Sequence, residues 1–184
     1  MVISLGEVRG IVKNLGERDT QNPEGAGVDL RIGEVHKITG GEAFIESDGA
    51  EGQGLRSGFE TEVVMTYTEN GDSKNQPRFV IKPGDYYLVK TIETVSIPLN
   101  VLADFRARSS LFRAGLNLLT TVGSPGYQGS LIFGLSNLGH APVTIQMGSR
   151  ICTAVFYRLE EDGVAYRGQH QGGRITSGGI EKQV

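Results

Sequence analysis

The chain has 184 residues, which is the size of one ordinary domain and leaves little room for two. Its 27 glycines follow no three-residue period, which excludes collagen, and 38% hydrophobic against 21% charged residues argue against disorder. The net charge of -3 provides no whole-molecule attraction to nucleic acid or to an anionic membrane, so neither partner is expected. We therefore expect a single globular domain over residues 1–184 with many tight turns.

The single cysteine and the N-terminal sequence bear on the compartment. Cys152 can form neither an internal disulfide nor a Cys-rich metal site, which is typical of a cytoplasmic protein. Residues Met1–Gly10 lack the basic start and the long apolar stretch of a signal peptide, and no run of about 18 apolar residues occurs. The sequence predicts a cytoplasmic protein that is neither secreted by that route nor membrane-spanning.

The pattern of elements changes after the N-terminus. Residues 1–18 predict one short helix, because Leu5, Val8 and Ile11 fall near helical spacing. From Val28 onward, short β-rich runs alternate with Gly, Pro, Asn and Asp. The clearest expected strands are Arg78–Lys82, Tyr86–Val95, Leu131–Leu135, Val143–Gln146 and Ile151–Tyr157. Many short strands at roughly even spacing predict an all-β antiparallel barrel or sandwich.

Two segments differ from the β-rich pattern. Gly40–Gly58 is rich in Gly, Glu and Ser, and we expect an exposed excursion or a long hairpin there. Gly168–Val184 is polar with almost no apolar anchor, so it is predicted to be a mobile C-terminal tail.

The segment Ala107–Gly115, ARSSLFRAG, groups guanidinium and hydroxyl side chains within six residues. They belong to Arg108, Ser109, Ser110 and Arg113. Guanidinium forks and hydroxyl donors suit a polyphosphate, because each charged oxygen can accept a short, charge-assisted hydrogen bond. A polar strand end followed by a helix with a serine cap explains the same residues without any ligand.

Two further motifs flank this segment. Gly123–Gly129, GSPGYQG, predicts a sharp turn in which Tyr127 can stack on a base or sugar, although most such turns bind nothing. In Gly27–Gly33, GVDLRIG, Asp29 and Arg31 share one face of a short strand. We expect these two to form an ion pair, either organising a site or lying on the surface with little energetic value.

Together these motifs resemble the dCTP deaminases, which share a fold with the trimeric dUTPases. GVDLRIG resembles their first motif, RSSLFRAG their phosphate-binding motif, and SPGYQGSL with LSNLG their nucleoside-binding hairpin. The run Gly148–Phe156, GSRICTAVF, is similar to the strand that follows. The resemblance covers most of residues 27–172 in family order and spacing.

The resemblance implies a distorted, jelly-roll-like β-barrel that forms homotrimers with active sites between subunits. It implies a pyrimidine deoxynucleotide ligand, dUTP or dCTP, with Mg²⁺ bound through the triphosphate. Arg108, Ser109, Ser110 and Arg113 match triphosphate-binding residues, and Arg113 also lies near the reacting base in deaminases. Tyr127 and Gly129 match the hairpin that shapes the sugar pocket, while Tyr166 and Gln169 match the C-terminal segment that closes over the nucleotide.

Two acids of the family pattern are replaced. Ser124 stands where the family usually has an Asp that binds the sugar hydroxyl, and a serine can make that hydrogen bond but is a poor base. Gly134 stands where deaminases carry a proton-shuttling Glu. Zinc-dependent deamination would need H-x-E and P-C-x-x-C motifs, which are absent, and the histidines are separated. We expect His36, His140 and His170 to be surface or turn residues.

Two explanations of the missing acids stay open. One is a relocated acid, for which Asp29 is preferred over Asp104, with partnership to an arginine as its alternative role. Arg113 and Asp29 are then the expected catalytic residues. Hydrolysis of dUTP to dUMP and pyrophosphate ranks above deamination of dCTP, because deamination needs a proton shuttle beside the ring. The other explanation is a nucleotide-binding paralogue that has lost catalysis.

Overall fold

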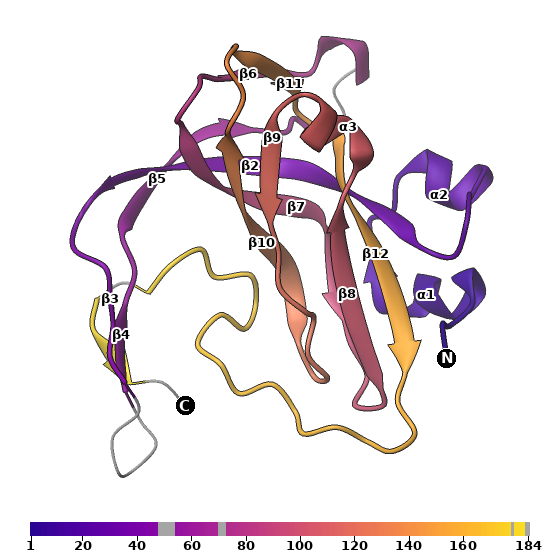
Figure 1. The fold of residues 1–184 in the computed structure, drawn as a ribbon. Helices are drawn as coiled ribbons and strands as arrows, with labels where there is room; N and C mark the ends of the chain where they lie inside the picture. The colour runs from indigo at the N-terminus through magenta and orange to yellow at the C-terminus, as the bar shows by residue number, and fades with distance from the viewer. Residues whose placement is uncertain (48–53, 70–72, 178, 183–184) are drawn as a thin grey trace.

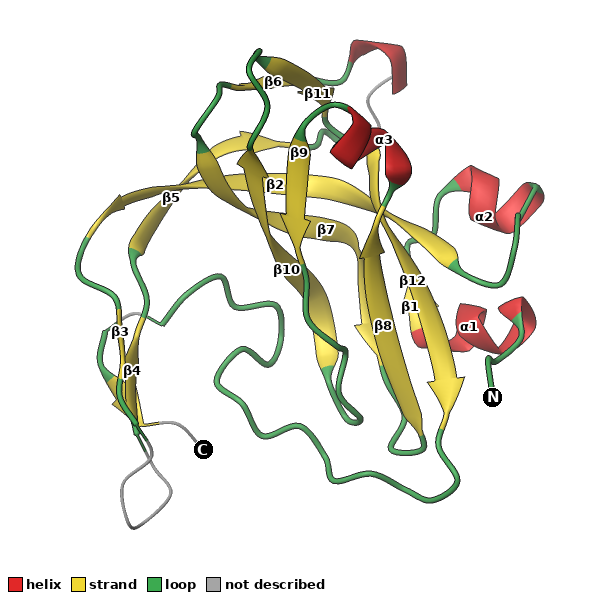
Figure 2. Cartoon of the chain, in the orientation of Figure 1, coloured by secondary structure: helices red, strands yellow, loops and turns green. Residues whose placement is uncertain are grey.

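The computed structural model describes residues 1–47, 54–69, 73–177 and 179–182 and is built mainly from antiparallel β-strands (Figure 1, Figure 2). An eight-stranded sheet runs in the order β8, β12, β2, β7, β10, β9, with β1 beside β7 and β5 beside β2. Its strands are β1 (Val12–Lys13), β2 (Val28–Gly40), β5 (Glu60–Thr66), β7 (Tyr86–Ser96), β8 (Val101–Ala107), β9 (Leu116–Leu119), β10 (Gln128–Asn137) and β12 (Arg150–Arg158).

The sheet curls into a nearly closed barrel. Ala103 of β8 and Gly123, which follows β9, exchange two backbone hydrogen bonds of 3.0 and 2.8 Å. A Cβ at position 123 would lie 2.7 Å from the Ile97 side chain and 3.0 Å from that of Ala103, so this closing contact requires glycine. The all-β barrel fold with a short N-terminal helix is thereby confirmed.

Alternating burial along the strands fills the barrel interior. In β7 and β8 every second residue is buried, as expected for strands with one face in the core. Phe105 of β8 and Phe133 of β10 meet inside with ring centroids 5.6 Å apart. Burying each such ring stabilises the fold by about 1.5–3 kcal/mol.

Shorter elements surround the barrel. Two small sheets pair β6 (Arg78–Ile81) with β11 (Val143–Gln146), and β4 (Leu55–Ser57) with both β3 (Phe44–Ile45) and β13 (Glu181–Lys182). The helices are α1 (Leu5–Ile11), α2 (Glu17–Gln21), α3 (Ser109–Arg113) and the 3-10 helix Ser73–Asn75. Figure 1 shows α3 at one end of the barrel, while the C-terminal tail crosses the other end.

The prediction of one helix over residues 1–18 was wrong in its extent. The helix α1 ends at Ile11, because Val12 pairs with Val95 as a strand and is 2% exposed. Asn14 then adopts a positive φ of 62°, which turns the chain into the separate helix α2. Strand pairing with the barrel has overridden the local helical spacing.

The two unusual segments lie together. The expected hairpin in 40–58 is present, because β3 and β4 pair antiparallel, while its residues 48–53 lie outside the described part. The tail returns to this hairpin, where Gly58 N donates to Ser177 Oγ at 2.6 Å and β13 pairs with β4. The mobility of the tail, whose residues 178, 183 and 184 are outside the described part, stays a prediction.

Within the described ranges, no helix has both the length and the apolar character needed to cross a membrane.

Candidate functional site

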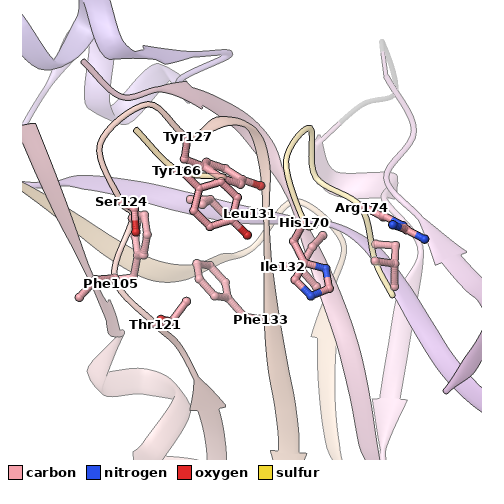
Figure 3. Close-up of a pocket in the computed structure, with 13 residues that line it drawn as sticks. Phe105, Thr121, Ser124, Tyr127, Leu131, Ile132, Phe133, Tyr166, His170 and Arg174 are labelled. Carbon is pink, nitrogen blue, oxygen red and sulfur yellow. The ribbon is translucent and has the colours of Figure 1, made fainter. Parts of the chain in front are cut away.

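A cavity of about 260 Å³ lies beside the turn that precedes β10. Figure 3 shows aromatic rings on one side of it, with His170 and Arg174 of the tail on the other. The rings are those of Phe105, Tyr127, Phe133 and Tyr166. This volume is near the lower end of the range of about 300–1,000 Å³ for small-molecule pockets. We call it the nucleoside pocket after the ligand that the resemblance in sequence implies for this hairpin.

The turn positions Tyr127 as a wall of the nucleoside pocket. Gly126 has a φ of 77° and donates its N–H to Ile97 O at 2.9 Å, so the chain reverses sharply just before the tyrosine. Tyr127 Oη donates to Ser130 O at 2.6 Å, and its ring meets that of Tyr166 edge-on at 5.4 Å. Burial raises the pKa of the Tyr127 hydroxyl above its ordinary value. Tyr127 therefore presents its ring to the cavity.

The C-terminal tail is hydrogen-bonded directly to the turn that precedes β10. Gly172 N donates to Gln128 O at 2.8 Å, while Gln171 Nε2 donates to Gly126 O at 3.0 Å. Gly129 has a φ of 130°, and a Cβ there would lie 2.5 Å from the carbonyl carbon of Gly172. Glycine at 129 is thus required for the tail to pack where it does.

Gln169 does not line the nucleoside pocket but an adjoining cavity of about 370 Å³ that shares Tyr166 and His170 with it. Its Oε1 is buried and has no hydrogen-bond partner among the described residues. A buried acceptor without a donor costs about 1–3 kcal/mol. A ligand N–H or O–H group would satisfy it.

The phosphate motif lies at the opposite end of the barrel. Arg108 is the N-cap of α3 and no side chain caps the helix, so the expected serine cap is absent. The buried Leu111 anchors the short helix, whereas Ser109, Ser110 and Arg113 are exposed. None of these motif residues lines the nucleoside pocket. A single chain therefore does not join the two parts that a nucleoside triphosphate would need.

Asp29 ties the phosphate motif to the barrel. It is 7% exposed, forms an ion pair with Arg108, and accepts hydrogen bonds from Arg150 Nη1 at 2.8 Å and Thr153 Oγ1 at 2.9 Å. Its own backbone N–H donates to Asp19 Oδ1 at 3.0 Å. These contacts match the arginine-partner role, and neither Asp29 nor Asp104 lines the nucleoside pocket.

The expected ion pair between Asp29 and Arg31 was wrong. Arg31 contacts β7, the strand on the other edge of β2 from the β12 partners of Asp29. Its Nε donates to Glu93 Oε1 at 2.6 Å, and its backbone N–H donates to Glu93 Oε2 at 2.7 Å. Glu93 is 0% exposed, so an arginine must accompany it. Two neighbouring charges on one strand thus serve different buried partners.

Asp104, the other candidate acid, accepts a hydrogen bond from Arg106 Nε at 2.9 Å. The arginine is 76% exposed, which makes this a surface pair of small energetic value. The described lining of the nucleoside pocket includes no Asp or Glu; its polar side chains are those of Ser124, Thr121, Tyr127, Tyr166, His170 and Arg174. Of these, sequence reasoning did not find Thr121 or Arg174, and it expected His170 only as a surface or turn residue.

The family model described as dCTP deaminase-like matches residues 5–159. The chain belongs to this family. It is 36% identical over 159 residues to a dCTP deaminase of Natronomonas pharaonis, covering 78% of this chain and 75% of that protein.

One more relative and one solved structure are also similar to this dCTP deaminase-like chain. It is 35% identical over 136 residues to a dUMP-forming dCTP deaminase of Dictyoglomus turgidum, covering 72% and 64% of the two chains. The solved 2'-deoxycytidine 5'-triphosphate deaminase of Agrobacterium tumefaciens superposes with a TM-score of 0.60 at 18% identity. That superposition covers 86% of this chain and 49% of the other, and it supports the fold alone.

Proposed function

We propose that this protein acts in pyrimidine deoxynucleotide metabolism by binding a deoxynucleoside triphosphate, and that it hydrolyses dUTP to dUMP and pyrophosphate. The observation that supports this proposal is the nucleoside pocket. It is lined by aromatic rings, is covered by the tail and has no carboxylate in its described lining. Aromatic walls suit a pyrimidine ring, and the unpartnered Gln169 Oε1 supplies an acceptor nearby. Membership of the dCTP deaminase-like family supports this ligand class.

The second candidate activity is deamination of dCTP. The names of relatives at 35–36% identity favour it. Against it stands Gly134, which cannot carry a proton where the family has a carboxylate. Hydrolysis of the triphosphate needs no proton-transferring group beside the nucleobase, so the glycine at position 134 impairs hydrolysis less than deamination.

In the proposed reaction, water attacks the α-phosphorus, a bond from the water oxygen to phosphorus forms, and the bond to the bridging oxygen breaks to release pyrophosphate. The proton of the attacking water passes to solvent water. Arg108, Ser109, Ser110 and Arg113 donate to the phosphate oxygens as negative charge shifts onto the leaving group. Arg113 is the catalytic residue of this set. We assign Asp29 a positioning role, because its carboxylate holds Arg108 against the barrel.

The site is assembled from two copies of the chain. Figure 1 shows α3 at one end of the barrel and the C-terminal tail, which contributes to the lining of the nucleoside pocket, at the other. In this proposal the pocket of one protomer therefore uses the phosphate motif of its neighbour. A head-to-tail contact of this kind closes into a ring when the rotation between neighbouring copies allows it, and we propose a ring of three, a homotrimer.

Mg²⁺ enters this proposal with the nucleotide. Within the described ranges, no cluster of three or more His, Cys, Asp or Glu side chains could hold a metal ion. We propose instead that the metal is chelated by the phosphate oxygens, where it would offset their negative charge.

The test measures binding, pyrophosphate and ammonia together, with dUTP or dCTP and Mg²⁺. We expect dUTP to bind and to release pyrophosphate, and Arg113→Ala to weaken binding roughly tenfold or more through the loss of charge-assisted hydrogen bonds. The control is Arg106→Ala, an exposed arginine outside the motif, which should leave both unchanged. Unchanged affinity in Arg113→Ala would refute the phosphate assignment.

Two other outcomes decide between the remaining alternatives. Tight binding without either product would identify a paralogue that has lost catalysis. Loss of pyrophosphate release in Asp29→Asn with full nucleotide affinity would make Asp29 the base and contradict its positioning role.

A further inference from the structure

Strand β7 carries a bulge opposite Leu131, a residue that lines the nucleoside pocket. On one side of Leu131 the register pairs Ser130 with Thr94, and on the other side it is shifted toward the start of β7. The residues Thr91–Glu93 of β7 therefore lie opposite Leu131 alone. A bulge disrupts the regular ladder of backbone hydrogen bonds, so other groups must bond the backbone here.

The hydroxyl of Thr91 supplies these bonds. Thr91 Oγ1 donates to Glu93 O at 2.7 Å and accepts from the backbone N–H of Leu131 at 3.0 Å. A hydroxyl can donate and accept at the same time, so one side chain bonds both strands. Thr91 is 3% exposed, which leaves water little access to replace these bonds.

The peptide group that joins Ser130 to Leu131 is held at both of its polar atoms. Its N–H donates to Thr91 Oγ1, and its carbonyl oxygen accepts from Tyr127 Oη at 2.6 Å. Both Tyr127 and Leu131 line the nucleoside pocket (Figure 3). Because a peptide group is planar, bonds at both ends fix its rotation. They thereby fix the direction of the Leu131 side chain and the hydroxyl end of the Tyr127 ring.

The other edge of the bulge is fixed to β2. The backbone N–H and Nε of Arg31 both donate to the carboxylate of Glu93. A Cβ at Gly33 of β2 would lie 3.1 Å from the backbone nitrogen of Ile92 and 3.2 Å from the carbonyl carbon of Thr91. Glycine at this position lets β2 approach the bulge closely. The backbone that carries the Thr91 hydroxyl is therefore held from both neighbouring strands.

We propose that Thr91 is a positioning residue of the nucleoside pocket, whose hydroxyl fixes the peptide between Ser130 and Leu131 and thereby the part of the wall formed by Tyr127 and Leu131. This role rests on the proposed function, because the pyrimidine ring must bind against that wall. Thr91 is not among the described lining residues, so it acts through its neighbours. Loss of the hydroxyl should weaken nucleotide binding and leave the phosphate motif unchanged.

The test compares the dissociation constants for dUTP in the wild type, Thr91→Val and Thr91→Ser, at a temperature where circular dichroism shows each to be folded. Valine keeps the shape of threonine without the hydroxyl, so dUTP binding should weaken about tenfold, as for the loss of one hydrogen bond. Serine keeps the hydroxyl, and its dissociation constant should stay within about twofold of wild type. In hydrolysis, Thr91→Val should raise KM by the same factor and leave kcat nearly unchanged.

The matched control is Gln76→Leu. Gln76 is also buried, and its side-chain amide bonds the backbone N–H and C=O of Thr68 at 3.0 and 2.9 Å, but it does not line the nucleoside pocket. This variant should lower the stability of the fold without changing the dissociation constant for dUTP. If Thr91→Val does not fold, Thr91→Cys is compared with Thr91→Ser, because the two differ only by sulfur in place of oxygen. A thiol is a weak donor and a weak acceptor, so the cysteine variant should bind dUTP severalfold more weakly.

Three results would overturn the positioning role while dUTP binding by the wild type upholds the proposed function. They are wild-type affinity in Thr91→Val, equal affinities in Thr91→Cys and Thr91→Ser, and a loss of affinity in Gln76→Leu as large as in Thr91→Val. If the wild type itself does not bind dUTP, the proposed function is refuted, and the role of Thr91 in binding is refuted with it.

Discussion

Replacement of Asp29 by Asn tests whether this carboxylate is a structural anchor of the phosphate motif. The variant keeps the shape of the side chain but leaves the guanidinium groups of Arg108 and Arg150 without their counter-charge. Breaking a fully buried pair costs about 3–5 kcal/mol. The two arginine side chains are 28% and 34% exposed, so solvent recovers part of this cost. We expect Asp29→Asn to lower the free energy of unfolding by about 2 kcal/mol.

Equilibrium unfolding in urea measures this loss. With a slope of about 2 kcal/mol per molar urea, the midpoint should fall by about 1 M. Chain concentration must be matched, because the stability of an oligomer depends on it. The control is Asp104→Asn, because the partner of Asp104, Arg106, is largely exposed and the midpoint should therefore hardly move. Equal midpoints for the two variants would refute the anchoring role of Asp29.

Three further predictions concern other parts of the barrel. Burial raises the pKa of Glu93 above its ordinary value despite its arginine partner. The folded state therefore holds the proton of Glu93 more tightly than the unfolded state does, and the stability gained from this is lost as the pH rises from the unfolded pKa through the folded pKa. Urea unfolding from pH 4 to 8 should therefore show the stability of wild type relative to Glu93→Gln falling as pH rises, and a rise would contradict this sign. Burial raises the pKa of the Cys152 thiol to about 12, so a disulfide reagent at pH 8 should react with it only after denaturation. Rapid reaction of the native protein, measured by absorbance, would show that β12 opens at Cys152 in the folded state and would contradict this prediction. Gly129→Ala should displace the tail at Gly172 and speed tryptic cleavage after Arg174, as read by mass spectrometry, and an unchanged cleavage rate would count against the tail contact.

The strands were predictable where turn-forming residues flank a run of residues that favour strands. Val143–Gln146 is β11 with the predicted bounds, since Pro142 and Gly148 flank a run of β-branched residues. The N-terminal helix was overextended, because local spacing does not reveal that Val12 pairs with β7. Long-range pairing is a property of the folded barrel and leaves no local signal.

The motif residues of the candidate site were predictable from the sequence, but the core residues that line its pocket were not. Tyr127 and Gly129 could be found from turn chemistry, whereas Phe105 and Phe133 fit the pattern of ordinary core residues on alternating strands. The roles of Asp29 and Arg31 depended on partners more than sixty positions away in sequence. Thr91 could not be linked to Leu131 without the register between β7 and β10.

If the pocket of one protomer and the phosphate motif of another form one site, mixed oligomers show it most directly. Arg113→Ala and Tyr166→Ala damage different halves, so oligomers of either variant alone should bind dUTP weakly. After co-refolding at equal amounts, a shared site combines two intact halves in about a quarter of cases, and binding should recover to that fraction of wild type. If both halves came from one chain, no intact site would form, and absence of recovery in verified mixed oligomers would contradict the account.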